Sequence, residues 1–103
     1  MYKLEYLPVA KHDLVEIIQY ISQVLQNPSA ADRLAVEIIT AIDKLPAFPY
    51  AFPVYIPVKS LKYEYRKLLV KNFIVFYYID ESNKLITISR VLYAKRNYKQ
   101  ILK

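Results

Sequence analysis

The sequence predicts an α+β fold of the order β-α-α-β-β-β, with an N-terminal helical hairpin packed on one face of a mainly antiparallel four-stranded sheet. Two observations predict it. Apolar residues recur at helical spacing between residues 9 and 45, and they alternate at strand spacing before and after that range. The 103 residues suffice for one core, so we expect a single domain spanning residues 1–103.

The first half of the chain predicts one strand and two helices. Residues 2–7 alternate apolar and polar side chains, and Pro8 ends this strand. Apolar residues then recur on one side of a helix of about four turns, which ends near Leu25. Asn27 followed by Pro28 predicts a capped start for a second helix, which extends to about residue 45. So short a connection predicts an antiparallel hairpin.

The second half predicts a loop and three strands. Residues 46–60 hold four of the six prolines among aromatic and aliphatic residues, which indicates an ordered loop along the edge of the core. Strands are predicted over residues 64–70, 73–80 and 84–93, with the apolar second of these at the centre. Because the chain has no glycine, we expect the asparagine in each hairpin turn to supply the positive φ. The sheet face away from the helices is expected to be open and available for function.

Positive charge is concentrated in the second half of the chain. The total is +6, but residues 1–58 carry four basic and six acidic residues, whereas residues 59–103 carry eleven basic and three acidic residues. The two parts therefore have net charges of −2 and +8. Such segregation favours binding to phosphate backbones or to an acidic protein segment, with plain solubility as the alternative explanation.

Several residue types that carry chemistry are missing or scarce. The absence of cysteine excludes disulfides and thiolate metal sites, and the absence of glycine removes the phosphate-cradling loops of nucleotide-binding proteins. The one histidine, His12, is expected on the solvated side of the first helix. We therefore expect no metal and no small-molecule cofactor. Because no apolar segment approaches 18 residues, we also expect a cytoplasmic protein without membrane contact.

Arginines, lysines and tyrosines on or beside the last three strands are left to carry function. Arginine matches phosphate with a planar fork, lysine adds a point charge, and tyrosine stacks on a base or donates a hydrogen bond. In an RNA-cleaving site, such a set would stabilise the charge of a phosphorane-like state and move protons. The candidate residues for nucleic-acid or partner binding are Lys59, Lys62, Lys67, Arg90, Lys95, Tyr98 and Lys99.

The alternation along the strands places some candidates on a face. Arg90 shares a face with the isoleucines of its strand and with Leu92, which is expected to be the helix-covered face. Arg90 is therefore either a paired structural residue or a phosphate ligand. Tyr93 alternates to the other face, which is expected to be open. For Arg66 the pattern leaves both faces as alternatives.

With these elements in order, the chain resembles toxins of the RelE/ParE superfamily from bacterial and archaeal type II toxin–antitoxin systems. The resemblance covers nearly the whole length. In the first half it rests on PVAKHDLVEIIQYI and NPSAADRLAVEIITAIDKLPAFP. More specific are YRKLLVKNFIVFYYID at residues 65–80 and ISRVLYAKRNY at residues 88–98.

The resemblance implies a toxin that inhibits growth, is associated with plasmid stabilization, and is held inactive by a cognate acidic antitoxin that wraps it. RelE-like members cleave messenger RNA on the ribosome, whereas ParE-like members inhibit DNA gyrase and have no accepted nuclease site. Carried over by position, Arg66 matches an arginine on the equivalent strand of RelE-like enzymes, and Arg96 matches their second arginine. Tyr93 stands where many relatives have histidine. Leu102 stands near the place of a catalytic tyrosine, and AKRNY replaces the usual GRRD-like ending.

Three hypotheses follow. The first is a ribosome-dependent mRNA endoribonuclease with Arg66, Tyr93 and Arg96 as its catalytic residues. The second is a non-enzymatic gyrase inhibitor, which the ParE-like helices and the missing tyrosine favour. The third is an RNA-binding module without toxicity, which predicts that induced expression does not stop growth. The fold is common to the first two, so the resemblance leaves the target open.

Overall fold

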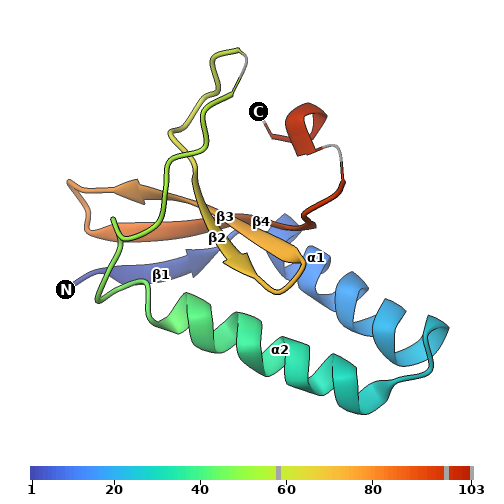
Figure 1. Cartoon of the computed structure of the whole chain (residues 1–103). Helices are drawn as coiled ribbons and strands as arrows, with labels where there is room; N and C mark the ends of the chain where they lie inside the picture. The colour runs from blue at the N-terminus through green and yellow to red at the C-terminus, as the bar shows by residue number, and fades with distance from the viewer. Residues whose placement is uncertain (58, 97, 103) are drawn as a thin grey trace.

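The computed structural model describes residues 1–57, 59–96 and 98–102, and it has two helices packed on one face of a four-stranded sheet (Figure 1). The predicted α+β order is confirmed. In chain order the elements are β1 (Lys3–Tyr6), α1 (Pro8–Gln19), a π-helical turn η1 (Tyr20–Val24), α2 (Pro28–Asp43), β2 (Arg66–Val70), β3 (Phe73–Asp80), β4 (Leu85–Tyr93) and a short 3-10 turn η2 (Tyr98–Gln100).

The sheet has the strand order β1-β4-β3-β2. β1 runs parallel to β4, and the other two pairings are antiparallel, so the sheet is mainly antiparallel as predicted. Parallel strands need a long connection, and here the two helices and strands β2 and β3 lie between β1 and β4 in the sequence. β3 lies inside the sheet, which explains why it is apolar on both faces.

The helical hairpin covers one face of the sheet and makes the main core with it. Asn27 caps α2, since its side-chain oxygen accepts a hydrogen bond from the N–H of Ala30 at 3.2 Å. Ile38 and Ile42 project from α2 into the core and are fully buried. They belong to one apolar cluster with Ile86 and other residues of the sheet. Burial of each such side chain contributes on the order of 2 kcal/mol.

The hairpin turns differ from the prediction in which residue adopts positive φ. Lys71 and Lys84 have φ of 54° and 51°, whereas neither Asn72 nor Asn83 has positive φ. Asn83 has another task, because its backbone N–H and its side-chain amide donate to the carboxylate of Asp80 at 3.2 and 2.7 Å. These two hydrogen bonds fix Asn83 and leave the position of positive φ to the next residue.

The second face of the sheet, away from the helices, is covered, so the expectation of an open face is wrong. The chain after α2 crosses the edge of β2, where the N–H of Lys67 donates to the carbonyl of Pro53 at 3.0 Å. It then packs on the second face, as does the segment after β4 (Figure 1). The buried residues there, called the second-face cluster below, are Tyr55, Tyr65, Ile74, Phe76, Leu92 and Leu102.

A β-bulge in β4 changes which face its last residues occupy. Phe76 pairs with Arg90 and Tyr77 pairs with Ile88, so one residue of β4 is left without a partner. Before the bulge, Ile88 packs in the helix-side core, as predicted. After it, Leu92 packs in the second-face cluster. The prediction for Leu92 is therefore wrong, because the extra residue shifts the alternation by one.

Candidate functional site

Arg66 lies at the start of β2 and holds the proline-rich loop. It shares the helix-side face with Leu68 and is half-buried. Its Nη1 atom donates to the carbonyl of Phe52 at 2.7 Å and more weakly to that of Tyr50 at 3.4 Å. The guanidinium also lies 5.0 Å from the centre of the Tyr50 ring. Its planar fork is thus already engaged within the protein.

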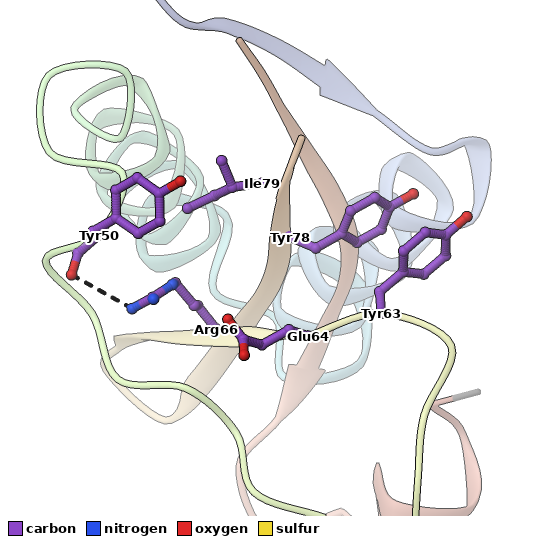
Figure 2. A pocket seen from close by; sticks show the side chains of 6 residues that line it. All are labelled: Tyr50, Tyr63, Glu64, Arg66, Tyr78 and Ile79. Atoms are coloured by element: carbon purple, nitrogen blue, oxygen red, sulfur yellow. Dashed lines mark hydrogen bonds between the residues drawn. The ribbon is translucent and has the colours of Figure 1, made fainter. Parts of the chain in front are cut away.

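A small pocket of about 140 Å³ adjoins Arg66 (Figure 2). It exists because β2 begins at Arg66, opposite Tyr77, while β3 continues to Asp80. On one side Tyr63 stacks on Tyr78, with parallel rings 4.0 Å apart. Burial raises the pKa of Tyr78, so its hydroxyl stays protonated at neutral pH.

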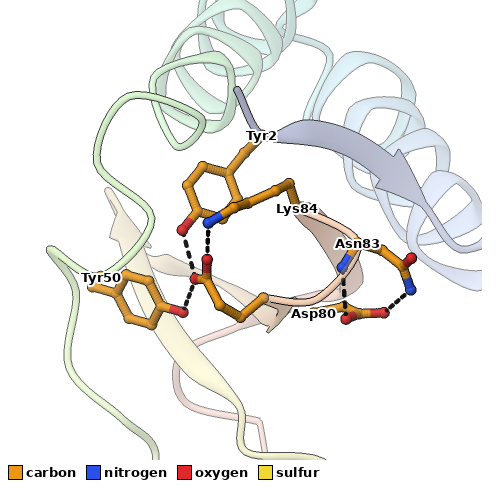
Figure 3. A network of polar contacts seen from close by, with 6 residues as sticks. Tyr2, Tyr50, Asp80, Asn83 and Lys84 are labelled. Atoms are coloured by element: carbon orange, nitrogen blue, oxygen red, sulfur yellow. Dashed lines mark hydrogen bonds and ion pairs between the residues drawn. The ribbon is translucent and has the colours of Figure 1, made fainter.

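Glu81 joins three parts of the chain at this end of the sheet. Its carboxylate accepts hydrogen bonds from the hydroxyls of Tyr2 and Tyr50 at 2.6 and 2.5 Å, and it pairs with Lys84 (Figure 3). Hydrogen bonds from Lys84, Tyr2 and Tyr50 lower the pKa of Glu81 to about 2. The same carboxylate raises the pKa of Tyr50 to about 12. These are fixed polar contacts that tie β1 and the loop to the β3–β4 turn.

Tyr93 lies at the opposite end of the sheet, at the end of β4. Its ring is 5.8 Å from that of Phe73, whose side chain packs against the helix-side core. Tyr93 lines an apolar groove of about 660 Å³ between the helical hairpin and the sheet, together with Ile17 and Tyr20. The prediction that Tyr93 occupies the face away from the helices is therefore wrong, and the bulge in β4 is the reason.

The three predicted catalytic residues are not brought together. Arg66 pairs with Tyr77, whereas Tyr93 pairs with Phe73, which lies four positions earlier in β3. Four positions of a strand span roughly 13 Å, and two strand spacings of about 4.8 Å separate β2 from β4. Arg96 is close to Tyr93 in the chain, with its N–H donating to the Tyr93 carbonyl at 2.9 Å, and its side chain is exposed.

Arg90 has the structural role that was one of its two predicted alternatives. Its Nε and Nη2 atoms donate to the two carboxylate oxygens of Asp13 at 2.8 and 2.9 Å. The Asp13 side chain is 5% exposed, so the pair joins α1 to β4 in a largely buried setting. Hydrogen bonding to Asp13 raises the pKa of Arg90. A phosphate ligand would have to compete with this bidentate pair.

The remaining binding candidates lie on the segments that cover the second face or at its edge. Tyr98 is a packing residue, since its ring lies 5.6 Å from that of Tyr55 and 5.1 Å from that of Phe76. Lys67 is half-buried, with its Nζ atom 5.8 Å from the centre of the Tyr55 ring. The side chains of the other candidates are exposed: Lys59, Lys62, Lys95 and Lys99.

Neither a metal cluster nor a membrane helix is found in the described part of the chain. Residues 1–57, 59–96 and 98–102 contain no group of three or more His, Asp or Glu side chains placed to hold a metal ion. The same residues contain no helix long and apolar enough to cross a bilayer. His12, as predicted, is on the exposed side of α1, where it pairs with Glu16 at 2.8 Å.

Comparison with protein families decides which family the chain belongs to. The family model described as the ParE toxin of the type II toxin–antitoxin system parDE matches residues 4–98. The chain belongs to the ParE toxin family. This confirms the predicted membership of the RelE/ParE superfamily and makes the protein a toxin of a type II toxin–antitoxin system. A search of curated protein sequences found no match.

Solved structures support the fold of this ParE-family toxin. The chromosomal ParDE system of P. aeruginosa has a TM-score of 0.73 and 20% identity, with 92% of this chain and 98% of that chain covered. The RelBE2 toxin–antitoxin complex of Mycobacterium tuberculosis has a TM-score of 0.60 and 17% identity, with 89% and 96% covered. The archaeal RelE–RelB complex of Pyrococcus horikoshii OT3 has a TM-score of 0.53 and 17% identity, with 92% and 97% covered.

Sequence reasoning missed three features of this ParE-family toxin. Asp13 could have been found, because it falls on the apolar side of α1 three residues after buried Ala10, where an acid needs a partner. The convergence of donors on Glu81 had no sequence signal, since they come from distant segments. The stack of Tyr63 on Tyr78 depends on the path of the loop, which periodicity does not describe.

Proposed function

We propose that this ParE-family toxin arrests growth by inhibiting DNA gyrase as a bound protein, without cleaving RNA. The observation that carries the proposal is the position of Arg66. A phosphoryl-transfer site must place its cationic groups around one phosphate. Arg66 instead donates to the carbonyl of Phe52 and lies at the end of the sheet opposite Tyr93.

The scarcity of proton-transfer groups also supports a non-enzymatic mechanism. The single histidine of the sequence, His12, projects from the outer side of α1 with its side chain 68% exposed. Leu102, which stands near the place of the catalytic tyrosine of RelE, is buried in the second-face cluster and cannot exchange protons. A nuclease would have to assemble its site from Tyr93, Arg96 and the neighbouring lysines alone.

A cognate acidic antitoxin is the proposed partner that keeps the toxin inactive. Two features of the molecule support it. The groove that Tyr93 lines is mainly apolar, and exposed Tyr20 and Leu25 extend it along the helical hairpin. The second half of the chain is also strongly basic. An antitoxin segment with apolar anchors would bind in this groove, and its acidic character would favour its encounter with the basic toxin. Co-expression of the antitoxin should restore growth.

Induced expression of the toxin in bacterial cells tests the proposal. Growth, plasmid supercoiling and message integrity are followed together in the wild type and in Arg66→Ala. We expect growth arrest with loss of negative supercoiling and with messages uncut at early times. Codon-linked cuts in translated messages, found by primer extension while supercoiling is intact, would establish the endoribonuclease instead. Unimpaired growth would favour the non-toxic RNA-binding module.

A further inference from the structure

Cations, all exposed except half-buried Lys67, gather on the two segments that cover the second face of the sheet. One segment runs from the loop into β2, and the other follows β4; in Figure 1 both rise on the side away from the helices. The ring contact between Tyr55 and Tyr98 holds the two segments together at 5.6 Å. The group, called the cationic face below, consists of Lys59, Lys62, Lys67, Lys95, Arg96 and Lys99.

The cationic face is not neutralised within the molecule. In residues 1–57, 59–96 and 98–102 the ion pairs involve other cations, namely Lys71, Lys84 and Arg90, together with His12. Glu64 is the single acid in the ranges 59–67 and 94–102. Six like charges held on a folded surface with a single acid beside them attract a polyanion strongly at low salt.

We infer that the cationic face binds the phosphate backbone of DNA. The inference rests on the proposed function and deepens it, because gyrase holds DNA while it acts and an inhibitor on gyrase can contact both. Phosphate groups need point charges rather than an apolar groove. Five of the six cations are lysines, which provide such charges without requiring one fixed geometry.

An acidic protein segment fits this face less well. A disordered acidic chain that orders on binding needs apolar anchors to offset its lost entropy. Here Phe76 and Leu102 face inward and are buried, and in the described ranges 55–57, 59–67, 94–96 and 98–102 the large apolar side chains that are exposed are limited to Ile56 and Tyr63. The groove lined by Tyr20 and Tyr93 supplies such anchors on the helix side. The two kinds of partner therefore have different surfaces.

Tyr63 adds a ring at the edge of the cationic face. It is 38% exposed, it stacks outward on Tyr78, and the Nζ atom of neighbouring Lys62 lies 5.4 Å from its centre. A tyrosine beside a lysine can pack against a sugar or an unpaired base while the lysine reaches the adjacent phosphate. This contact is independent of sequence, so we expect little preference among DNA sequences.

Titration of a labelled 20-base-pair duplex with purified toxin, without gyrase, tests the inference. The wild type should bind, with log K falling against log salt at a slope of about −3 to −5 when most of the six cations are engaged. The triple variant Lys95→Ala, Arg96→Ala, Lys99→Ala should reduce the size of that slope by about 3 and weaken binding at least tenfold at low salt. Circular dichroism checks that the variant remains folded.

A charge-matched variant on the helices provides the control. The triple variant Lys11→Ala, Arg33→Ala, Lys44→Ala also removes three positive charges, but from exposed positions on the helical hairpin and at the end of α2. It should leave the slope within about one unit of the wild type. Equal loss in both triple variants would overturn the inference, since binding would then follow net charge alone.

Two further outcomes would also overturn it. One is the absence of duplex binding by the wild type at low salt. The other is tighter binding to a poly-glutamate peptide than to the duplex, which would assign the face to an acidic protein. Inhibition of gyrase is measured separately, so a toxin that inhibits gyrase without binding free DNA refutes this inference and leaves the proposed function standing.

Discussion

Asp13 is a buried acid that determines how α1 sits on β4. It accepts hydrogen bonds from Arg90 Nε and Nη2 and from the backbone N–H of Val91 at 3.0 Å. The bulge in β4 comes directly before Val91, and Asp13 satisfies the N–H there. Asp13 thus pairs with a largely buried cation and also accepts a hydrogen bond from the backbone beside the bulge.

Replacing Asp13 should therefore be costly. Asp13→Ala leaves Arg90 largely buried without its partner and the Val91 N–H without an acceptor, so we expect a loss of about 3 to 5 kcal/mol in the free energy of unfolding by urea denaturation. The paired change Asp13→Leu, Arg90→Met should lose less, because no buried charge remains. Glu16→Ala, which breaks an exposed pair on the same helix, should change stability by less than about 1 kcal/mol. A loss for Asp13→Ala no larger than that of Glu16→Ala would contradict this role.

The Glu81 contacts predict a dependence of stability on acid pH. The pKa of Glu81 is lowered from 4.5 to about 2 in the folded protein by its three hydrogen-bond donors. Because the folded pKa is below the unfolded one, the stabilisation is complete above the unfolded pKa and is lost as pH falls from about 4.5 to about 2. Melting temperatures measured across this window should fall more for the wild type than for Glu81→Gln. Parallel profiles for the two proteins would show that Glu81 contributes nothing.

At the scale of elements, the sequence predicts what its periodicity encodes and misses what depends on irregular backbone. The helices, the strands and the Asn27 cap follow from local spacing and are found close to their predicted positions. The exception is the end of the first helix, where the π-helical turn η1 replaces the predicted last α-helical turn. The bulge is different. Because Val91, Leu92 and Tyr93 form an unbroken apolar run, their pattern reads the same with or without an extra residue before them, and the side of Tyr93 was predicted wrongly.

The covering of the second face was also beyond periodicity. Phe76 and Leu92 could pack on either an open or a covered face, and the loop and the C-terminal segment have no regular spacing to place them. The candidate site was predicted in part for the same reason. The basic residues were identified from composition, whereas the separation of Arg66 from Tyr93 follows from strand register.

Leu102 should anchor the C-terminal segment to the sheet. It is 4% exposed in the second-face cluster, so Leu102→Ala should lower the free energy of unfolding by about 2 to 4 kcal/mol through lost burial and the cavity left behind. Ile56→Ala is the matched control, since Ile56 is 85% exposed and should change stability by less than about 0.5 kcal/mol. If the two variants are equally stable in urea, the segment after β4 does not pack as described.

At the scale of the whole molecule, the two faces of the sheet carry different surfaces. The helix side has the apolar groove at Tyr93, which suits an antitoxin segment. The second face has the cationic face, which suits DNA. An antitoxin held in the groove need not compete directly for the phosphate contacts. It would prevent toxicity by keeping the toxin from its protein target.

We propose that this ParE-family toxin stops growth at gyrase without breaking RNA. Titration of purified toxin into a gyrase supercoiling reaction on relaxed plasmid tests it most directly, with the toxin–antitoxin complex as the control. We predict that supercoiling is lost as toxin is added at micromolar concentration, and that the complex has no effect. Unchanged supercoiling, together with codon-linked cuts when the same protein is added to translating ribosomes, would contradict the claim.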